Sequence, residues 1–379
     1  MNRILTVIFL LFVWWMPLHA QDIEYVWVRG RVLEQQNQSP LPGANVFLTG
    51  STLGAATLND GSFEFRVPGR MLSYEITVSM VGFNTESRVL NETDIANTTL
   101  RFELVPATYL LEEVTITESN AEWLSTLARF ERLVFSTTDN SKDCTILNPE
   151  KLSLVYDNVD REISATSREP FRFENKALGY LVELHQPKFF GSETTVMWEG
   201  NLHFEELAPQ NESEEQKWVA NRRDAYNGSV RQFLVALARG ETNKKGFFVA
   251  TTERPGYSIE HKVAPNPDKY VTVEFADPTI PTWRIYFPRT LAISYQLESE
   301  SMAYRLYQDQ MGLRERDEME FQTGRLRERR TQNSWLSLNG DYAIIDQYGN
   351  EYGAYLLKRF GYWEWERLCE ILPSDFSLN

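Results

Sequence analysis

The chain has 379 residues, of which 42% are hydrophobic and 13% aromatic, so it is long enough to bury a substantial core and to divide into about two domains. It carries 53 acidic and 38 basic residues, a formal net charge of −15. This acidity argues against nucleic acid or an anionic lipid surface as its general partner.

The first twenty residues have the pattern of a secretory signal. A short basic start over residues 1–3 precedes an apolar stretch over 4–16 that is too short for a comfortable membrane span. Leu18-His19-Ala20 before Gln21 fits a signal-peptidase site, so cleavage is expected after Ala20. No later apolar run approaches the length of a span. We therefore expect a periplasmic protein, either free in the periplasm or held peripherally at the outer membrane, with no integral span.

Short strands joined by tight turns follow this segment. Asn59-Asp60-Gly61 supplies residues that tolerate positive φ, as a hairpin turn requires. The residues after it, 62–67, alternate polar and apolar, and residues 76–83 do the same. Pro40 and Pro42 belong to the turn before a strand that begins at Ala44, because proline cannot donate to a central ladder. Several short strands at roughly even spacing predict a β-sandwich.

Five motifs in this region carry a family resemblance: Gly30-Arg31-Val32, residues 41–46, Gly54, residues 57–63 and residues 79–83. Together they resemble the carboxypeptidase regulatory-like domain, a transthyretin-like β-sandwich common in secreted and outer-membrane proteins of Bacteroidota. The region is also similar to the N-terminal extension of many TonB-dependent receptors. The resemblance implies a sandwich over 25–106 and an envelope setting, and it implies no peptidase activity.

A linker strand is expected over 107–120. Within it, Leu110–Thr117 allows two interpretations. A sharp one makes it a strand that is offered to the sheet edge of a partner. The favoured one is a connecting strand, because nothing in the chain resembles a receptor plug.

The remainder, 121–379, is predicted to be an α+β domain rich in strands, and whether it forms one domain or two is left open. Helices are expected near 121–135, 213–239 and 362–371. Gly228 should break the second of these, with Ser229 capping the part that follows. The predicted fold class is therefore mainly β or α+β, with an N-terminal transthyretin-like sandwich.

Several segments of this remainder resemble an uncharacterised Bacteroidota group that pairs the regulatory-like sandwich with a second region. They are residues 173–180, 204–207, 222–229, 233–237 and 361–368. This resemblance brings no assigned activity, so it nominates no catalytic residue.

Few residues suggest chemistry. Of the histidines beyond the signal, His185, His203 and His261, only His203 has a suggestive neighbour, because Glu206 lies at the His-x-x-Glu spacing of a carboxypeptidase zinc site. A strand is expected here, and it would place positions three apart on opposite faces. We therefore predict no catalytic residue, no cofactor and no metal ligand.

The other polar clusters can also be explained by structural rather than catalytic roles. Arg222, Arg223 and Arg231 suggest an anion patch, but a solvated helix face is favoured. The run Arg314–Arg330 mixes both signs and suits an exposed strand pair or helix. The two cysteines, Cys144 and Cys369, permit either a disulfide in an oxidising compartment or two buried thiols.

Three functions remain open. The first is a non-catalytic cell-envelope interaction protein, whose sandwich docks to an outer-membrane or periplasmic protein, for which a TonB-dependent receptor system is one candidate. The alternative is a glycan-binding module in which tryptophans stack on sugar faces. Its candidate platform draws on Trp198, Trp218, Trp283, Trp335, Trp363 and Trp365. A metal-dependent hydrolase comes third.

Overall fold

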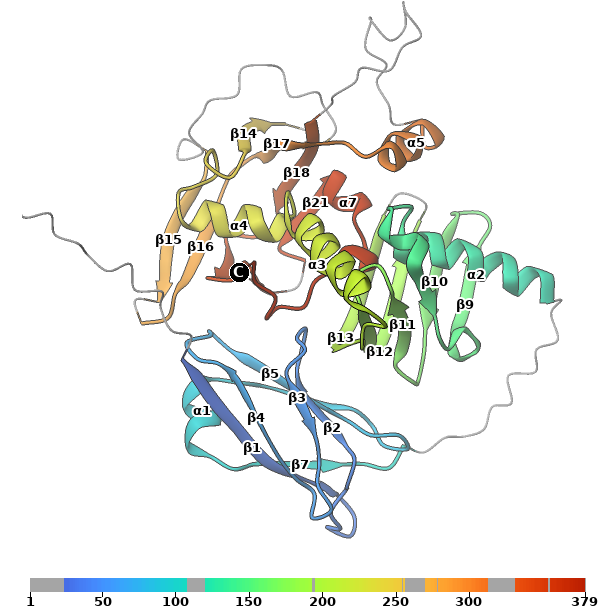
Figure 1. Cartoon of the computed structure of the whole chain (residues 1–379), viewed down its shortest axis with the longest axis vertical. Helices are drawn as coiled ribbons and strands as arrows, with labels where there is room; N and C mark the ends of the chain where they lie inside the picture. The colour runs from blue at the N-terminus through green and yellow to red at the C-terminus, as the bar shows by residue number, and fades with distance from the viewer. Residues whose placement is uncertain are drawn as a thin grey trace, which may run out of the picture.

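Figure 1 shows a computed structural model of the chain, which describes residues 24–107, 120–192, 195–253, 255, 270–277, 279–312, 331–353 and 355–378. The fold is mainly β, as the sequence predicted. A β-sandwich formed by the N-terminal residues lies beside a larger part that combines further sheets with helices. None of the described helices is both long enough and apolar enough to cross a membrane.

The sandwich is made of two sheets that face each other, with strand orders β4-β1-β7 and β3-β2-β5-β6. Its elements are β1 (Tyr25–Glu34), β2 (Asn45–Leu48), β3 (Gly54–Ala56), β4 (Ser62–Pro68), β5 (Tyr74–Ser79), β6 (Glu86–Leu90), α1 (Glu92–Asn97) and β7 (Leu100–Leu104). Alternate residues such as Val28, Phe65 and Phe102 point into a shared core. The predicted turn forms before β4, with Gly61 at φ +76°.

The larger part begins with a six-stranded sheet, which we call the second sheet. Its strand order is β8-β11-β12-β10-β9, and β13 pairs with β12. Its strands are β8 (Cys144–Ile146), β9 (Ser153–Asp157), β10 (Glu162–Thr166), β11 (Phe171–Asn175), β12 (Tyr180–Gly191) and β13 (Val196–Glu206), with the short turns η1 (Asn140–Asp143) and η2 (Pro149–Lys151). Helix α2 (Asn120–Phe135) covers one face, where Phe130 packs edge-on against Phe171 and Phe189. The helix predicted over 121–135 is thus confirmed.

Two four-stranded sheets complete the larger part, with the orders β14-β17-β18-β21 and β15-β16-β19-β20. They comprise β14 (Phe247–Thr252), β15 (Thr272–Asp277), β16 (Thr282–Tyr286), β17 (Thr290–Ser299), β18 (Thr331–Leu338), β19 (Ala343–Asp346), β20 (Glu351–Tyr352) and β21 (Leu357–Gly361). Helices α4 (Val230–Ala238) and α5 (Met302–Gln310) lie beside them, whereas α3 (Glu212–Tyr226) packs against the second sheet. Phe233 and Leu237 of α4 share one core with Ile293 and Ile345 from the two sheets.

The helical region predicted over 213–239 is confirmed as two helices. Asn211 caps α3 by accepting a hydrogen bond from the Glu214 N–H, and Ser229 caps α4 by accepting one from the Gln232 N–H. Between the two helices, Gly228 adopts φ +73°, which favours glycine. The break and both caps therefore follow from local sequence.

The helix expected over 362–371 is wrong in extent. The chain forms α7 (Tyr362–Trp365) and then a separate 3-10 turn, η4 (Leu368–Glu370). Arg367 lies between them in an extended conformation and donates hydrogen bonds to the carbonyl oxygens of Leu133 and Arg132, at 2.6 and 3.3 Å. Those carbonyls lie at the C-terminal end of α2, so a tertiary contact interrupts the helix.

A disulfide joins Cys144 in β8 to Cys369 in η4, which answers a question that the sequence left open. It links two residues 225 positions apart and ties η4 to the first strand of the second sheet. Asn175 strengthens the same junction by donating a hydrogen bond to the Cys369 carbonyl oxygen at 2.9 Å. The C-terminal turn is therefore fixed to the core of the second sheet.

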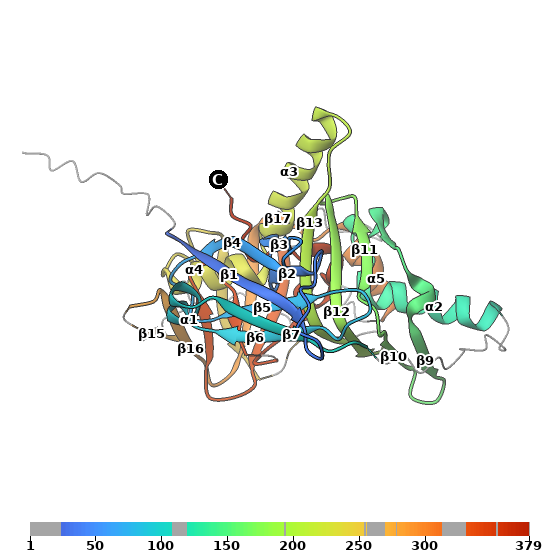
Figure 2. The same cartoon turned by 90° about the horizontal axis from the view of Figure 1, so that it is seen from below.

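The sandwich is joined to the larger part through the loop 49–53 and the sheet that contains β2, β5 and β6. Backbone hydrogen bonds run from Gly50 N to Leu202 O at 2.7 Å and from Phe204 N to Ser51 O at 3.1 Å. The Asn201 side chain of β13 donates to Thr77 Oγ1 of β5 at 2.8 Å. In Figure 2, the other sheet, with β1 and β7, lies on the far side of the sandwich from β12 and β13.

Candidate functional site

The sandwich has an open side where β6 and β7, the last strands of their sheets, lie opposite each other. At one end they are joined by a hydrogen bond from Asn84 N to Val105 O at 2.9 Å, and Ala107 N donates to Gly82 O at 2.8 Å. Beyond this junction a surface groove of about 450 Å³ lies along the two edges. We call it the edge groove; its lining includes Gln35, Asn84, Thr85, Glu86, Arg88, Arg101, Glu103, Leu104 and Val105.

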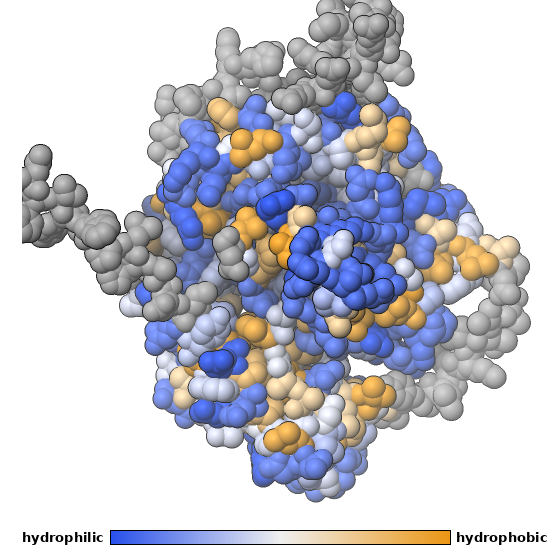
Figure 3. All heavy atoms as spheres, in the orientation of Figure 1, coloured by the Kyte–Doolittle hydropathy of each residue, from blue (hydrophilic) through white to orange (hydrophobic). Residues whose placement is uncertain are grey.

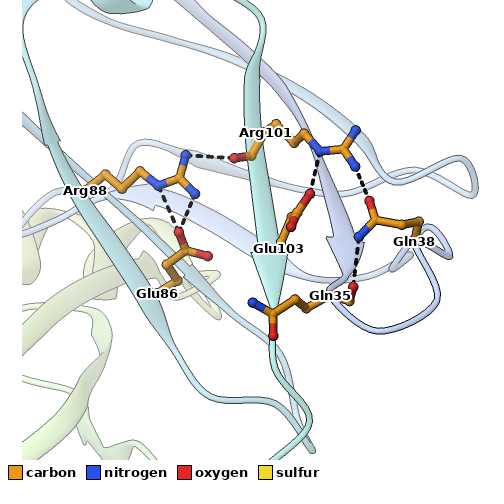
Figure 4. Close-up of polar contacts among 6 residues, drawn as sticks. All are labelled: Gln35, Gln38, Glu86, Arg88, Arg101 and Glu103. Carbon is orange, nitrogen blue, oxygen red and sulfur yellow. Dashed lines mark hydrogen bonds and ion pairs between the residues drawn. The ribbon is translucent and has the colours of Figure 1, made fainter.

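Arg88 spans the gap between the two sheets (Figure 4). It donates to Glu86 Oε1 from Nε at 2.8 Å and from Nη2 at 2.5 Å, and its Nη1 donates to the Arg101 carbonyl oxygen at 2.7 Å. Its guanidinium carbon lies 4.5 Å from the centroid of the buried Phe102 ring. One side chain therefore both covers the core and satisfies an edge carbonyl of β7.

Arg101 continues the polar network on the outer face of β7 (Figure 4). Its Nε donates to Glu103 Oε1 at 2.7 Å, and its Nη2 donates to Gln38 Oε1. Gln38 Nε2 in turn donates to the Gln35 carbonyl oxygen at 2.8 Å. Because both guanidiniums are paired with carboxylates, the groove suits polar or mixed partners better than a strongly anionic ligand.

The edge groove adjoins a polar cleft of about 800 Å³ between the sandwich and the second sheet, and Asn84 and Thr85 line both. We call this space the interdomain cleft. A β-bulge shapes its far wall, because the register of β12 against β13 shifts between His185 and Lys188. Gln186 within the bulge has φ +54°, an uncommon conformation for a residue other than glycine, and its amide reaches Thr85 O at 3.4 Å.

Aromatic and arginine side chains alternate on the outer face of the sheet β4-β1-β7. The Arg66 guanidinium carbon lies 5.7 Å from the Tyr25 ring centroid and 5.4 Å from that of Trp27. The Arg29 guanidinium carbon lies 5.0 Å from the same Trp27 centroid. Tyr25 and Trp27 are 50% and 41% exposed, so both rings remain accessible. We call this group the outer-face stack.

The two described histidines lie behind the interdomain cleft, in the joint between the sandwich and the second sheet. His203 stacks on Phe47 of the sandwich with 4.4 Å between ring centroids, and buried His185 lies 5.1 Å from the same ring. Burial lowers the pKa of His203 to about 4, against the opposing effect of the Glu183 carboxylate. His185 Nε2 lies 3.4 Å from Glu183 Oε2, and the His185 contact lowers the pKa of that carboxyl.

The His-x-x-Glu pair is separated as the strand pattern predicted. His203 faces Phe47, whereas Glu206 forms an ion pair with Arg222 at 2.9 Å. Within the described part of the chain, no group of three or more histidine, cysteine, aspartate or glutamate side chains is placed to hold a metal ion. His261, Leu110–Thr117 and Arg314–Arg330 lie outside the described residues.

The expected solvated face of Arg222, Arg223 and Arg231 is wrong for two of its members. Arg222 donates to the Leu178 carbonyl oxygen at 2.7 Å and lies 4.1 Å from the Tyr180 ring centroid. Arg231 is partly buried and binds backbone carbonyls, while only Arg223 is exposed. These arginines hold the fold together and form no common patch.

Four of the six tryptophans considered for a sugar platform are buried: Trp218, Trp335, Trp363 and Trp365. Three of them donate through the indole N–H to protein oxygens, as buried tryptophan usually does. The accessible tryptophan on the sandwich is instead Trp27, which sequence reasoning missed. Its signal was the alternation of Tyr25, Trp27 and Arg29 just before the recognised motifs.

Comparison with known proteins identifies the sandwich. Residues 28–116 match the family described as the CarboxypepD_reg-like domain, in agreement with the resemblance seen in the sequence. Among curated proteins, none matches the chain. Among solved structures, a 9R-lipoxygenase from Cyanothece PCC8801 is 10% identical over 58% of this chain and 49% of that chain, with a TM-score of 0.16, and a likeness of that degree indicates neither a shared fold nor a shared activity.

Proposed function

We propose that this chain is a non-catalytic interaction protein of the bacterial cell envelope, whose sandwich docks to an outer-membrane or periplasmic protein. The carrying observation is that one sheet of the sandwich is held by the second sheet, while the edge groove remains accessible. A module fixed in this way presents its free edge and its outer face in a constant orientation. A preorganised surface of this kind loses little entropy on binding.

The accessible residue types favour protein binding. The outer-face stack presents tryptophan, tyrosine and arginine, which are the types enriched in the centres of protein interfaces. The edge groove offers guanidiniums, carboxylates and the edge of β7, which can pair with an extended segment. Figure 3 shows that hydrophilic residues dominate the face that it draws, with apolar residues in small groups, so large apolar contacts are not expected there.

The envelope setting rests on two features of the chain. Residues 1–20 have the pattern of a secretory signal, and the disulfide between Cys144 and Cys369 is of the kind that persists in oxidising compartments such as the periplasm. A Bacteroidota source and a partner from a TonB-dependent receptor system belong to the same proposal, because both rest on the resemblance of the sandwich.

Site-specific photo-crosslinking in intact envelopes tests the docking. A photo-reactive residue replaces Val105, which lines the edge groove and is 38% exposed, and a matched control replaces Leu147, which is 45% exposed on the loop after β8. We expect a discrete protein adduct from position 105 only, weakened by Arg101→Gln. The same adducts from both positions, or none from position 105 at native expression, would exclude the edge groove as the docking site.

A second candidate is glycan binding in the interdomain cleft. Its lining is rich in amides and hydroxyls, among them Asn84, Thr85, Ser167 and Gln186, which suit sugar hydroxyl groups. A glycan array compares the wild-type chain with Asn84→Ala. Absence of binding by the wild-type chain would remove this candidate.

A metal-dependent hydrolase is the third candidate and has the least support. Phe47 covers His203, whereas the exposed Glu206 pairs with Arg222, so the two groups do not face a common substrate. An activity that survives His203→Phe would exclude the only motif that suggested hydrolysis.

A further inference from the structure

The segment 373–377 lies in the joint between the sandwich and the larger part without belonging to a helix or strand. It folds into a single turn, in which Phe376 N donates to Pro373 O at 3.0 Å. A small cavity of about 90 Å³ beside it is lined by Tyr25, Leu48, Leu53, Pro68 and Met71 from the sandwich and by Tyr348, Asn350, Ser374, Asp375 and Ser377. The segment therefore touches both parts of the molecule.

Arg231 of α4 is the main contact to the backbone of this segment. Its Nη1 donates to Pro373 O at 2.7 Å, and its Nη2 donates to Ser374 O at 2.6 Å and to Phe376 O at 2.8 Å. Its Nε donates to Tyr348 O at 2.8 Å, in the turn after β19. One guanidinium thus donates to three carbonyl oxygens of the same turn from a planar fork of N–H groups, which lysine cannot reproduce.

The turn between β19 and β20 holds the Arg231 side chain in position. Asp346, only 2% exposed, accepts hydrogen bonds from Tyr348 N at 2.8 Å and Asn350 N at 2.9 Å. These bonds fix the turn whose Tyr348 carbonyl binds Arg231. The β19–β20 turn therefore positions the Arg231 side chain through Nε, and its two Nη groups face the segment.

The sandwich contributes the second half of the site. Asp375 accepts a hydrogen bond from Thr52 N at 3.0 Å and another from Thr52 Oγ1 at 2.5 Å. Ser374 N donates to Gly50 O at 2.7 Å. A carboxylate that accepts a backbone N–H and a hydroxyl together is a specific recognition element, because an amide in its place would lose the charge of the acceptor.

An aromatic contact adds a third element. The Phe376 ring lies 5.9 Å from the ring of Tyr226 at the end of α3, with an interplanar angle of 55°. The backbone contacts of Arg231 tolerate many sequences, so specificity rests on the Asp375 carboxylate and the Phe376 ring.

We propose that Arg231, Thr52 and Tyr226 form a peptide-binding site that the chain's own segment 373–377 fills, and that a second peptide with the same Asp-Phe pair can occupy. The site lies outside the edge groove and the interdomain cleft, so it is independent of the proposed docking function. Because the sandwich supplies Thr52 and Gly50, occupation of the site strengthens the joint between the sandwich and the larger part.

A competition experiment on full-length chains tests the exchange. The probe is a fluorescently labelled synthetic peptide with the sequence of residues 371–379, and its polarisation is measured against increasing protein. Asp375→Asn in the protein weakens the internal segment and leaves the site intact. We expect the labelled wild-type peptide to bind this variant about tenfold more tightly than it binds the wild-type protein. The reason is that the internal segment has lost its charge-assisted contact with Thr52 and competes less strongly with the peptide.

Two controls make the result decisive. Asp341→Asn, the same change at an exposed position away from the site, should leave peptide binding as in the wild-type protein. A labelled peptide with asparagine in place of its aspartate should bind the Asp375→Asn protein about tenfold more weakly than the wild-type peptide. Equal binding of the two peptides, or no binding to any variant, would overturn the proposal. No variant in this test changes Arg231, so loss of folding at that position cannot account for the result.

Discussion

At the scale of single residues, Gly179 shows how one position constrains two elements. It sits in the turn between β11 and β12 with φ +72°, and a Cβ placed on it would lie 2.3 Å from the Trp218 ring of α3. Trp218 is itself fixed, because its indole N–H donates to Lys176 O at 2.8 Å. The small residue therefore allows α3 to approach the second sheet.

Gly179→Ala should therefore lower the free energy of unfolding by about 2–4 kcal/mol, from left-handed strain and from overpacking together. Gly240→Ala is the matched control, since Gly240 has φ +66° but no heavy atom within 4 Å of the added Cβ, and it should cost only about 1 kcal/mol. Urea unfolding of both variants measures the difference. Equal losses would mean that the Trp218 contact adds no cost.

The disulfide supports a second prediction at this scale. Replacing Cys144 and Cys369 with serine should lower the free energy of unfolding by about 2–5 kcal/mol, because the bridge restricts a long loop of the unfolded chain. Denaturation with and without a reducing agent measures the loss. The wild-type protein should respond to reduction and the double variant should not; a response from both would place the effect elsewhere.

At the scale of elements, the helices show what the sequence can and cannot predict. Local signals were sufficient for α2, α3 and α4, because apolar periodicity and the caps at Asn211 and Ser229 act within a few residues. The extent of the helix predicted over 362–371 was wrong, because Arg367 donates a hydrogen bond to a carbonyl oxygen more than 200 positions away. Such a contact leaves no trace in a local pattern.

The joint between the sandwich and β12–β13 should weaken in acid. His203 has its pKa lowered to about 4 by burial, while in the unfolded chain it titrates near 6.5. Between pH 6.5 and pH 4, His203 is therefore protonated in the unfolded chain but neutral in the folded chain. The stability that is present above pH 6.5 is consequently lost as the pH falls towards 4. The loss from pH 7 to pH 5 should reach about 2 kcal/mol.

His203→Phe isolates this effect, because it keeps a ring against Phe47 and removes the titration. Glu183 and His185 face His203 on β12, and Arg172 pairs with Glu183 at 2.8 Å, so all three remain in the variant. Glu183, with its pKa lowered, loses its contribution only as pH falls below about 4.5, outside the range measured. Urea unfolding at pH 7 and pH 5 should show a smaller loss for the variant; identical losses would exclude His203 as the source.

At the scale of the whole molecule, the candidate site is an assembly that no single segment encodes. The edge groove combines Arg88 from β6 with Arg101 from β7, and the outer-face stack combines Trp27 from β1 with Arg66 from β4. Strand alternation predicts that such residues point out of the core. Which of them meet depends on strand order and register, and these are set by tertiary packing.

The same reasoning applies to the joint, where loop 49–53 receives contacts from β13 and from the C-terminal segment. Since these contacts combine backbone bonds at Gly50 and Ser51 with side-chain bonds from Asn201 and Asp375, the sandwich and the larger part should unfold together in one calorimetric transition. Combining Asn201→Ala with Asp375→Asn removes side-chain contacts on both sides of the loop. The transition should then split in two, with the sandwich unfolding separately.

Trp27→Ala is the control for this splitting, because Trp27 lies on the outer face of the sandwich, where its contacts are Arg29 and Arg66. It should lower the stability of the sandwich without uncoupling it, so a single transition should persist. Differential scanning calorimetry of the three proteins distinguishes the cases. If the double variant keeps one transition at a lower temperature, the backbone bonds of the loop alone are sufficient for coupling. If the wild-type protein already shows two transitions, the joint does not couple the two parts, and the sandwich folds as a separate module.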